Sequence, residues 1–168
     1  LIGQLAGERG TTPSNLDGTG ITDDETLELS VTAANRLTHE ILEGLSVSDQ
    51  RAASANAIIS HPAGIVDGVD QQRTGRIERV DVSMLKTLLA EGIIPVIPPL
   101  GFDGQGNTFR LNSDAIAQAV SEALGAIKLI FIGTTDGLKI DNRLVRQISS
   151  GDLEKALKDN ADLEAGQE

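Results

Sequence analysis

Helical and extended patterns alternate along most of this chain, and that alternation constrains its fold more than any other feature. The pattern predicts a helix after Thr22, a strand over residues 52–60, a helix from Val82, a buried strand over residues 93–97 and a helix from Ser113. Short loops connect these segments. This order is typical of an α/β layer fold with parallel strands.

The first helix has a start signal and an apolar stripe. Thr22 and Glu25 have the spacing of a capping box, in which the Thr hydroxyl accepts from the backbone N–H three residues on. Apolar side chains then recur at three- and four-residue steps, which predicts the face that packs on the core. They are Leu27, Val31, Ala34, Leu37, Ile41 and Leu45.

Weaker patterns mark the rest of the chain. They predict helices over residues 1–9 and 152–158 and a strand over residues 128–132. The acidic segment 159–168 is predicted to be a mobile tail. We therefore expect one domain over residues 1–158 followed by that tail.

Residues 64–81 combine turn signals with a charged, alternating pattern. Asp67-Gly68 is a tight-turn dipeptide and Thr74-Gly75 is a weaker turn signal, so we expect a protruding β-hairpin. The segment carries Arg73, Arg76 and Arg79. These arginines can close over an anionic small molecule, or they can form a solvated face in which ion pairs contribute little. The residues leave both interpretations open.

Composition excludes several functions. Lys and Arg total 14 against 25 Asp and Glu, so the net charge is 14 − 25 = −11, which argues against nucleic acid as a partner. No cysteine is present, which excludes disulfides and thiolate metal sites. His39 and His61 are not at metal-ligand spacing. No apolar run approaches the ~20 residues of a membrane span, and residues 1–10 lack signal-peptide features. A soluble, cytoplasmic protein is expected.

Ligands of α/β folds bind beyond the carboxyl ends of the strands, which directs attention to the loops after Ile97 and Ile132. Asn112-Ser113-Asp114 begins a helix, where free N–H groups can bind an anion. A cap by Ser113, with Asp114 stabilising the helix dipole by ~0.3–1 kcal/mol, is the favoured interpretation. The Gly-rich segment 101–107 favours a turn, because it lacks the ending of a P-loop. Residues 133–137 fit either a nucleotide site or a turn.

Four segments together resemble a known family. They include Thr-Asp-Asp-Glu-Thr-Leu-Glu (22–28), Glu-Gly-Ile-Ile-Pro-Val-Ile-Pro-Pro-Leu-Gly (91–101), Leu-Asn-Ser-Asp (111–114) and the segment 124–130. The sequence resembles the amino-acid kinase family, in particular its N-acetylglutamate branch. The resemblance implies a three-layer α/β sandwich with a mainly parallel central sheet and a protruding hairpin. It also implies a homodimer or higher homo-oligomer.

The resemblance implies two activities of arginine biosynthesis. Acetylglutamate kinases phosphorylate N-acetylglutamate with ATP and Mg²⁺, whereas N-acetylglutamate synthases join a kinase-like domain to a separate domain that uses acetyl-CoA. Residues 64–81 and 143–148 resemble the synthases more, so a kinase-like domain that binds a small amino-acid metabolite or supports assembly is expected. The kinase is the alternative, and a non-catalytic binding or oligomerisation module is a second one.

Site residues follow from the same resemblance. The implied substrate-binding residues are Asn112, Arg110 and Arg76, the nucleotide-binding residues are Thr134 and Gly137, and Asp114 is catalytic only in a kinase. Departures accompany them: Gly20 stands where the family has a substrate-binding arginine, Arg110 replaces an asparagine, and Gly133-Thr134 lacks an acid. The segments that carry the family's two catalytic lysines have no counterpart, so we expect a domain that is incomplete at both ends.

Overall fold

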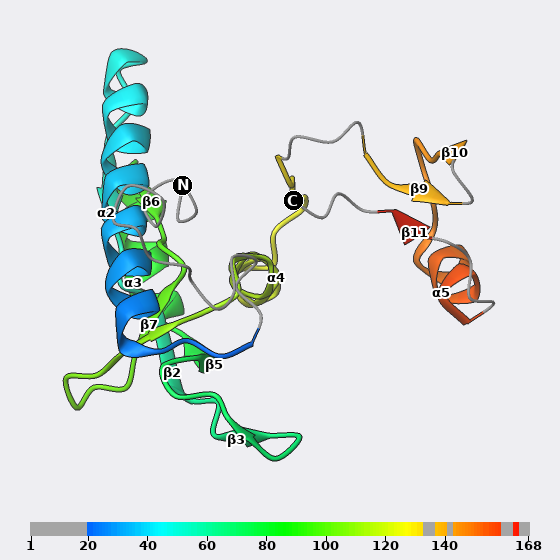
Figure 1. The fold of residues 1–168 in the computed structure, drawn as a ribbon. Helices are drawn as coiled ribbons and strands as arrows, with labels where there is room; N and C mark the ends of the chain where they lie inside the picture. The colour runs from blue at the N-terminus through cyan, green and yellow to red at the C-terminus, as the bar shows by residue number, and fades with distance from the viewer. Residues whose placement is uncertain (1–19, 133–136, 141–142, 159–162, 165–168) are drawn as a thin grey trace. The chain divides into compact units, whose positions relative to one another are not determined.

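The computed structural model describes residues 20–132, 137–140, 143–158 and 163–164. It divides into two units, residues 1–129 and 130–168, which are treated separately. In chain order (Figure 1) the elements are α2 (Asp24–Val47), β1 (Ala52–Ser54), β2 (Ile58–Pro62), β3 (Ile65–Val66), β4 (Val69–Asp70), β5 (Gly75–Val80), α3 (Val82–Ala90), β6 (Ile94–Val96), β7 (Leu100–Phe102), β8 (Thr108–Arg110), α4 (Ser113–Leu124), β9 (Lys139–Ile140), β10 (Arg143–Leu144), α5 (Ser150–Lys158) and β11 (Leu163–Glu164).

The first unit is a layered α/β fold. Its central pairs, β1 with β6 and β2 with β7, are parallel, whereas β5 and β8 are antiparallel to β2 and β7 at the outside. The helices α2 and α4 lie on opposite sides of the sheet (Figure 1). The predicted α/β class, with parallel strands at its centre, is confirmed.

The core on the α4 side joins both shorter helices to the sheet. Leu85 of α3 is fully buried with Ala55 and Ala57, and Val120 and Leu124 of α4 pack against this cluster. A second cluster contains Ile58 of β2, with Leu111 and Ile116 at the start of α4. The beginning of α4 is thereby held firmly on the sheet.

The start of α2 differs from the predicted capping box. Asp23, not Thr22, is the cap, and its carboxylate accepts from the backbone N–H of Thr26 at 2.7 Å. Thr22 is buried, and its hydroxyl accepts from the hydroxyl of Thr74 at 2.9 Å. The prediction is wrong because the Thr22 hydroxyl is engaged in a tertiary hydrogen bond. Asp23 provides the same capping chemistry one residue later.

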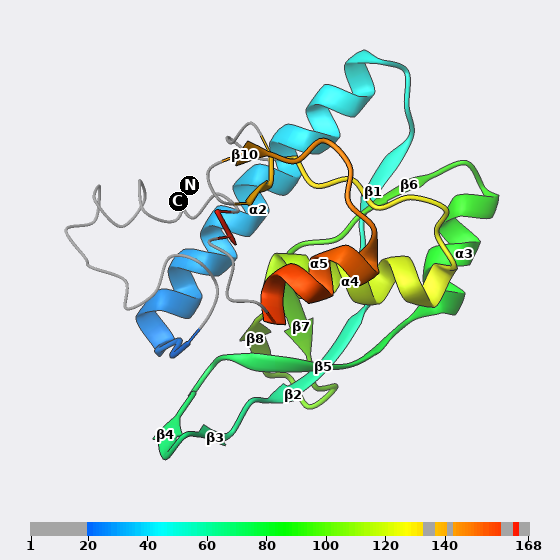
Figure 2. The same ribbon diagram turned by 90° about the vertical axis from the view of Figure 1, so that its right-hand side faces the viewer.

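The buried face of α2 also differs from the predicted stripe. Leu37 and Ile41 of that stripe are exposed, and only its Ala34 is buried. Figure 2 shows the helix along its length. Its buried side chains are mostly small or hydroxyl-bearing, and the helix contacts β1, β6 and β8. Spacing alone favoured the larger residues. The buried set is Thr26, Leu29, Ser30, Ala33, Ala34 and Thr38.

The strands β5, β2, β7 and β8 form a four-stranded sheet in that order, and this sheet curls so that its edge strands β5 and β8 meet. The backbone N–H of Arg110, at the end of β8, donates to the carbonyl oxygen of Arg73, just before β5, at 2.9 Å. Gly75 is not the predicted turn residue but the first residue of β5, where a Cβ would lie 2.6 Å from the Cβ of Phe109. The turn comes earlier, where Gln72 has a φ of 51°. The absence of a side chain at position 75 permits this close approach.

The predicted protruding hairpin is confirmed. The strands β3 and β4 pair antiparallel across Asp67-Gly68, whose φ angles are 51° and 80°. Two successive positive φ angles are those of a type I′ turn, which suits the twist of a two-residue hairpin.

The Gly-rich segment 101–107 contains the predicted turn, because residues 103–107 turn the chain from β7 into β8, although its first two residues belong to β7. One other segment corrects the sequence predictions. Residues 128–132 form no strand. Their apolar side chains are exposed, including Ile130 and Phe131, so the strand preference of this segment finds no partner in the described part of the chain.

The second unit contains a small sheet of order β10-β9-β11 and the helix α5, which confirms the predicted helix near residues 152–158. Within the segment predicted to be a mobile tail, Leu163–Glu164 pairs with β9. The predicted helix over residues 1–9 and the remainder of the tail lie outside the described residues. Among the helices that are described, none has the length and apolar character needed to cross a membrane.

Candidate functional site

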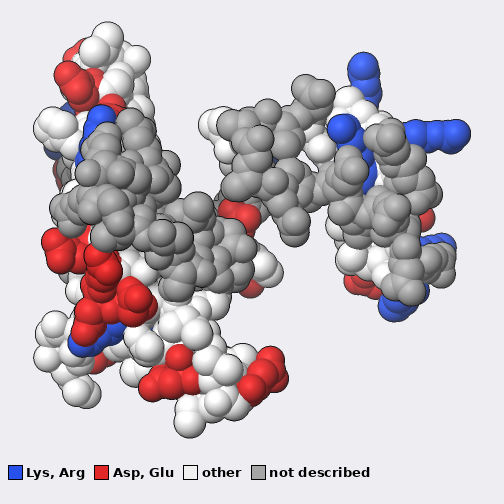
Figure 3. All heavy atoms as spheres, in the orientation of Figure 1, with Lys and Arg blue, Asp and Glu red and all other residues white. Residues whose placement is uncertain are grey.

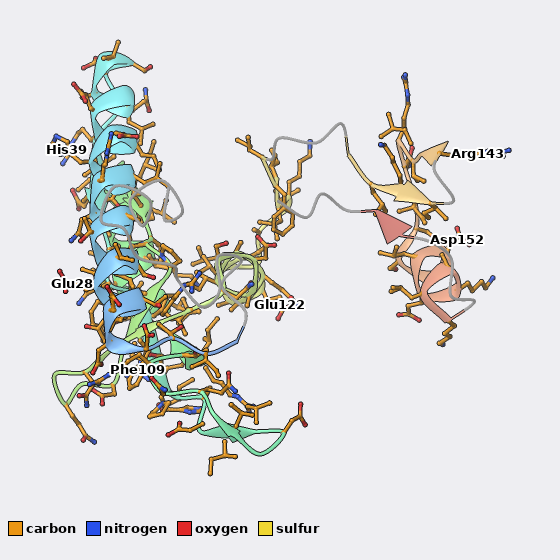
Figure 4. All side chains as sticks on the ribbon, in the orientation of Figure 1. Glu28, His39, Phe109, Glu122, Arg143 and Asp152 are labelled. Carbon is orange, nitrogen blue, oxygen red and sulfur yellow. The ribbon has the colours of Figure 1, made fainter. Side chains whose placement is uncertain are left out.

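A polar cleft of about 720 Å³ lies at the carboxyl ends of β2 and β7. Ser60, His61 and Pro62 of β2 line one part of it, and Asp103, directly after β7, lines another. Phe109 of β8, labelled in Figure 4, also lines the cleft. The carboxyl edge of parallel strands is where ligands of open α/β sheets bind.

Arg73 is anchored at this cleft by the first turn of α2. Its Nε lies 2.7 Å from Oδ1 of Asp24, and both residues line the cleft. The two residues are 49 positions apart in sequence, so this ion pair joins two separate segments. The backbone N–H of Arg73 also donates to the carbonyl oxygen of Thr22 at 2.8 Å. The ion pair orients the guanidinium toward α2, although 82% of the Asp24 side chain is exposed, and the backbone hydrogen bond holds the chain at Arg73 beside Thr22.

Asp103 is held by the hairpin turn in which it lies. Its carboxylate accepts from the side-chain amide of Asn107 at 2.6 Å and from the backbone N–H of Gln105 at 2.7 Å. These hydrogen bonds, that of the Asn107 side chain most strongly, lower the pKa of Asp103 below its ordinary value. The side chain is therefore a fixed negative charge at neutral pH.

The charges of the cleft are mainly negative. Figure 3 shows Asp and Glu gathered over the amino-terminal part of α2, with basic atoms beside them. With histidine neutral, one arginine and four carboxylates give 1 − 4 = −3 for the described lining. The ionisable lining residues are Asp24, Asp70, Glu78, Asp103, Arg73 and His61.

The predicted residues at the start of α4 do not line this cleft. Asn112 is the helix cap, and its side-chain oxygen accepts from the backbone N–H of Ala115 at 2.9 Å. The prediction that Ser113 forms the cap is therefore wrong. Asp114 is exposed in the first turn of α4, as the dipole interpretation expects.

The two predicted arginines lie close in the sheet but not in the cleft lining. Arg110 is buried, with 5% of its surface exposed, at the end of β8. Arg76 is exposed on β5, opposite His61 of β2. Of the three arginines that the hairpin segment carries, Arg73 is the one that reaches the cleft.

The predicted nucleotide-binding residues, Thr134 and Gly137, are not among the described residues of the first unit. Thr134 lies outside the described residues, and Gly137 belongs to the second unit, where it has a φ of 129°. Their assignment stays a prediction.

A second cavity in the first unit is an apolar groove of about 350 Å³ along α4. Ile116, Val120 and Leu124 of α4 line it, together with Ile97 and Leu129. Its lining offers few polar groups to orient a metabolite. Across the described residues, no cluster of three or more His, Asp or Glu side chains is arranged to hold a metal ion.

Comparison with known proteins places this architecture. A family model described as the amino acid kinase family matches residues 4–167. This chain belongs to the amino acid kinase family. It is 37% identical over 150 residues to an amino-acid acetyltransferase of Pseudomonas fluorescens, a match that covers 83% of this chain and 35% of that protein. An amino-acid acetyltransferase of Pseudomonas putida is 36% identical over 151 residues.

Two solved structures of N-acetylglutamate synthase from Neisseria gonorrhoeae share the fold of this amino acid kinase family member. One, complexed with coenzyme A and N-acetyl-glutamate, has a TM-score of 0.83 at 27% identity and covers 94% of this chain and 37% of its own. The other, complexed with coenzyme A and L-arginine, has a TM-score of 0.76 at 25% identity, with 94% and 39% covered. The chain therefore spans little more than a third of the length of these relatives.

Proposed function

We propose that this chain is the kinase-like part of an amino-acid acetyltransferase, an N-acetylglutamate synthase, and that its cleft binds a small amino-acid ligand. The observation that carries the proposal is the match to proteins named amino-acid acetyltransferase over 83% of the chain. In the parent protein, the acetyl group of acetyl-CoA would pass to the amino group of glutamate in a separate domain. The present domain would then sense or hold a metabolite.

The cleft supports the ligand-binding half of this proposal. It lies at the carboxyl edge of β2 and β7, it is large enough for a metabolite, and it contains charges of both signs on Arg73 and Asp103. An amino acid also carries both signs. Arg76 and Arg110 lie in the same curled part of the sheet, outside the cleft lining. Their role in substrate binding stays a proposal.

The kinase alternative receives less support from the described residues. Phosphoryl transfer depends on positive charge placed around the moving phosphoryl group. The cleft lining has an excess of carboxylates, and the side chain of Asn112 is engaged as a helix cap. Arginine biosynthesis, cytoplasmic location and homo-oligomeric assembly stay predictions of the family resemblance.

The test uses the purified parent protein. Incubation with acetyl-CoA and glutamate should release coenzyme A and form N-acetylglutamate. Incubation with ATP, Mg²⁺ and N-acetylglutamate should leave ATP intact. Formation of acetylglutamyl phosphate, without acetyl-CoA turnover, would replace this proposal by the kinase alternative.

A further inference from the structure

The guanidinium of Arg73 is the starting point, because only one of its edges is in use. Its Nε pairs with Asp24, and among the described residues no partner approaches the two terminal nitrogens. The side chain is 40% exposed. A guanidinium held at Nε presents the rest of its planar fork in a fixed orientation, which suits a carboxylate.

The surroundings of Arg73 limit which ligand this fork can bind. Asp70, Glu78 and Asp103 line the same cleft, and no second arginine or lysine does so in the described part of the chain. A ligand with two carboxylates and a blocked nitrogen, such as N-acetylglutamate, would meet one cation and an excess of like charge. A ligand whose carboxylate adjoins a free ammonium would match both signs.

We infer that Arg73 binds the carboxylate of a free amino acid in this cleft, and that the surrounding carboxylates select ligands whose α-ammonium is unblocked. The inference rests on the proposed function, because it assigns a residue and a ligand class to the same cleft. It adds a recognition residue that differs from Asn112, Arg110 and Arg76.

The position of Gly20 is consistent with this assignment. Gly20 stands where the resemblance implies an arginine, and it has no side chain with which to contact a carboxylate. Its carbonyl oxygen accepts from the hydroxyl of Thr74, the residue after Arg73.

A purely structural role is the alternative. Arg73 would then only tie residues 71–74 to α2 through Asp24. The two roles differ in one respect: a structural arginine affects every ligand of the cleft alike, whereas a carboxylate-binding arginine affects only ligands that have the carboxylate.

The experiment is calorimetric titration of the parent protein with pairs of probes. L-arginine is compared with agmatine, which lacks the α-carboxylate, and L-glutamate is compared with N-acetyl-L-glutamate. For the wild type we expect N-acetyl-L-glutamate to bind the cleft at least about tenfold more weakly than the free amino acid. Arg73→Gln should weaken binding of the free amino acid about ten- to hundredfold, the effect of a lost charge-assisted hydrogen bond. It should not weaken the binding of agmatine, which has no carboxylate for Arg73 to bind.

Matched variants complete the design. Arg36→Gln removes an arginine whose Nε also pairs with a carboxylate, that of Glu40 at 3.2 Å, but which does not line the cleft, so it should bind as the wild type does. If Arg73→Gln fails to fold, Arg73→Lys takes its place. This variant keeps the charge without the planar fork and should weaken binding of the free amino acid by a smaller factor.

The outcomes separate this inference from the proposed function. Equal weakening of arginine and agmatine binding by Arg73→Gln, or no weakening of either, overturns the role of Arg73 while ligand binding itself stands. Tighter cleft binding of N-acetyl-L-glutamate than of L-glutamate overturns the ligand class. Because the separate domain of the proposed function also holds glutamate and its acetylated product, the cleft's share of that binding is the share that Arg73→Gln removes. A parent protein that binds neither L-arginine nor agmatine overturns the ligand-binding part of the proposed function.

Discussion

The amino-terminal ends of α2 and α4 have nearly the same local chemistry but different surroundings. Asp23 caps α2 at 2.7 Å from the N–H of Thr26, and Asn112 caps α4 at 2.9 Å from the N–H of Ala115. The first turn of each helix contains an acidic residue, Asp24 in α2 and Asp114 in α4. Asp24 holds Arg73 at the polar cleft, whereas the start of α4 packs through Ile116 on the core. A favourable helix start therefore does not by itself make a ligand site.

The largest expected effect tests the close contact between β2 and β7 that forms one side of the cleft. In Gly101→Ala, the new Cβ would lie 2.6 Å from the Cβ of Ser60 and 2.7 Å from Leu111. Overpacking of this kind destabilises by about 1–3 kcal/mol, which denaturant unfolding would measure. The control Gly44→Ala lies in α2 with open space around it and should stabilise the helix by roughly 0.5–1 kcal/mol. A Gly101→Ala protein as stable as the wild type would show that β2 can move away from β7.

The two caps provide the second test. Asp23→Ala and Asn112→Ala should each lower the free energy of unfolding by about 1 kcal/mol, because each leaves a helix N–H without its partner. Their effects on the cleft should differ. Asp23→Ala loosens the turn that carries Asp24 and should weaken amino-acid binding, whereas Asn112→Ala should leave the affinity unchanged. Calorimetric titration of both variants measures this. If only Asn112→Ala lost binding, the amino acid would bind at the start of α4 and not in the cleft beside α2.

These two helix starts also show how far the sequence leads. It predicts the hairpin at Asp67-Gly68 and the first residue of α4 correctly, because these signals are local, although the cap of α4 is Asn112 and not Ser113. It misses the cap at Asp23, since only the fold reveals that Thr22 is occupied by Thr74.

The cleft is harder still to predict. Asp24, Arg73 and Asp103 belong to three separated segments, and no spacing in the chain relates them. Their proximity arises from the parallel pairing of β2 with β7 and from the curl that brings Arg73 beside the end of β8. Asn112 and Asp114, in contrast, belong to one contiguous motif. Such a motif can be recognised in the sequence alone, which is why the resemblance pointed to these two residues.

Acid provides a third and smaller test of the caps. Hydrogen bonds from the side chain and the N–H of Thr26 lower the pKa of Asp23, so the folded state favours its ionised form. A depressed folded pKa means that this contribution is present above the ordinary pKa of the carboxyl and is lost as the pH falls through the folded pKa. The amide of Asn112 does not titrate. Asp23→Asn should therefore flatten the acid limb of the stability curve below a pH of about 4.

The measurement is denaturant unfolding at a series of pH values. Asn112→Asp is the converse variant, and it should steepen the same limb by giving α4 a cap that titrates. If Asp23→Asn left the acid limb unchanged, its cap would not distinguish the ionised from the neutral carboxyl.

The smallest expected effects come from two ion pairs that resemble each other. Arg73–Asp24 joins distant segments at 2.7 Å, and Arg36–Glu40 joins successive turns of α2 at 3.2 Å. Both are substantially exposed, so Asp24→Asn and Glu40→Gln should each change the free energy of unfolding by less than about 1 kcal/mol. Amino-acid affinity should nevertheless fall only in Asp24→Asn, because there the guanidinium loses the partner that orients its fork. Thermal unfolding and calorimetric titration of the same two samples measure both quantities. If Asp24→Asn lowers the affinity without a matching fall in stability, the Arg73–Asp24 pair orients the guanidinium. If Asp24→Asn and the wild type bind with equal affinity, Asp24 contributes no more to the cleft than Asp114 does.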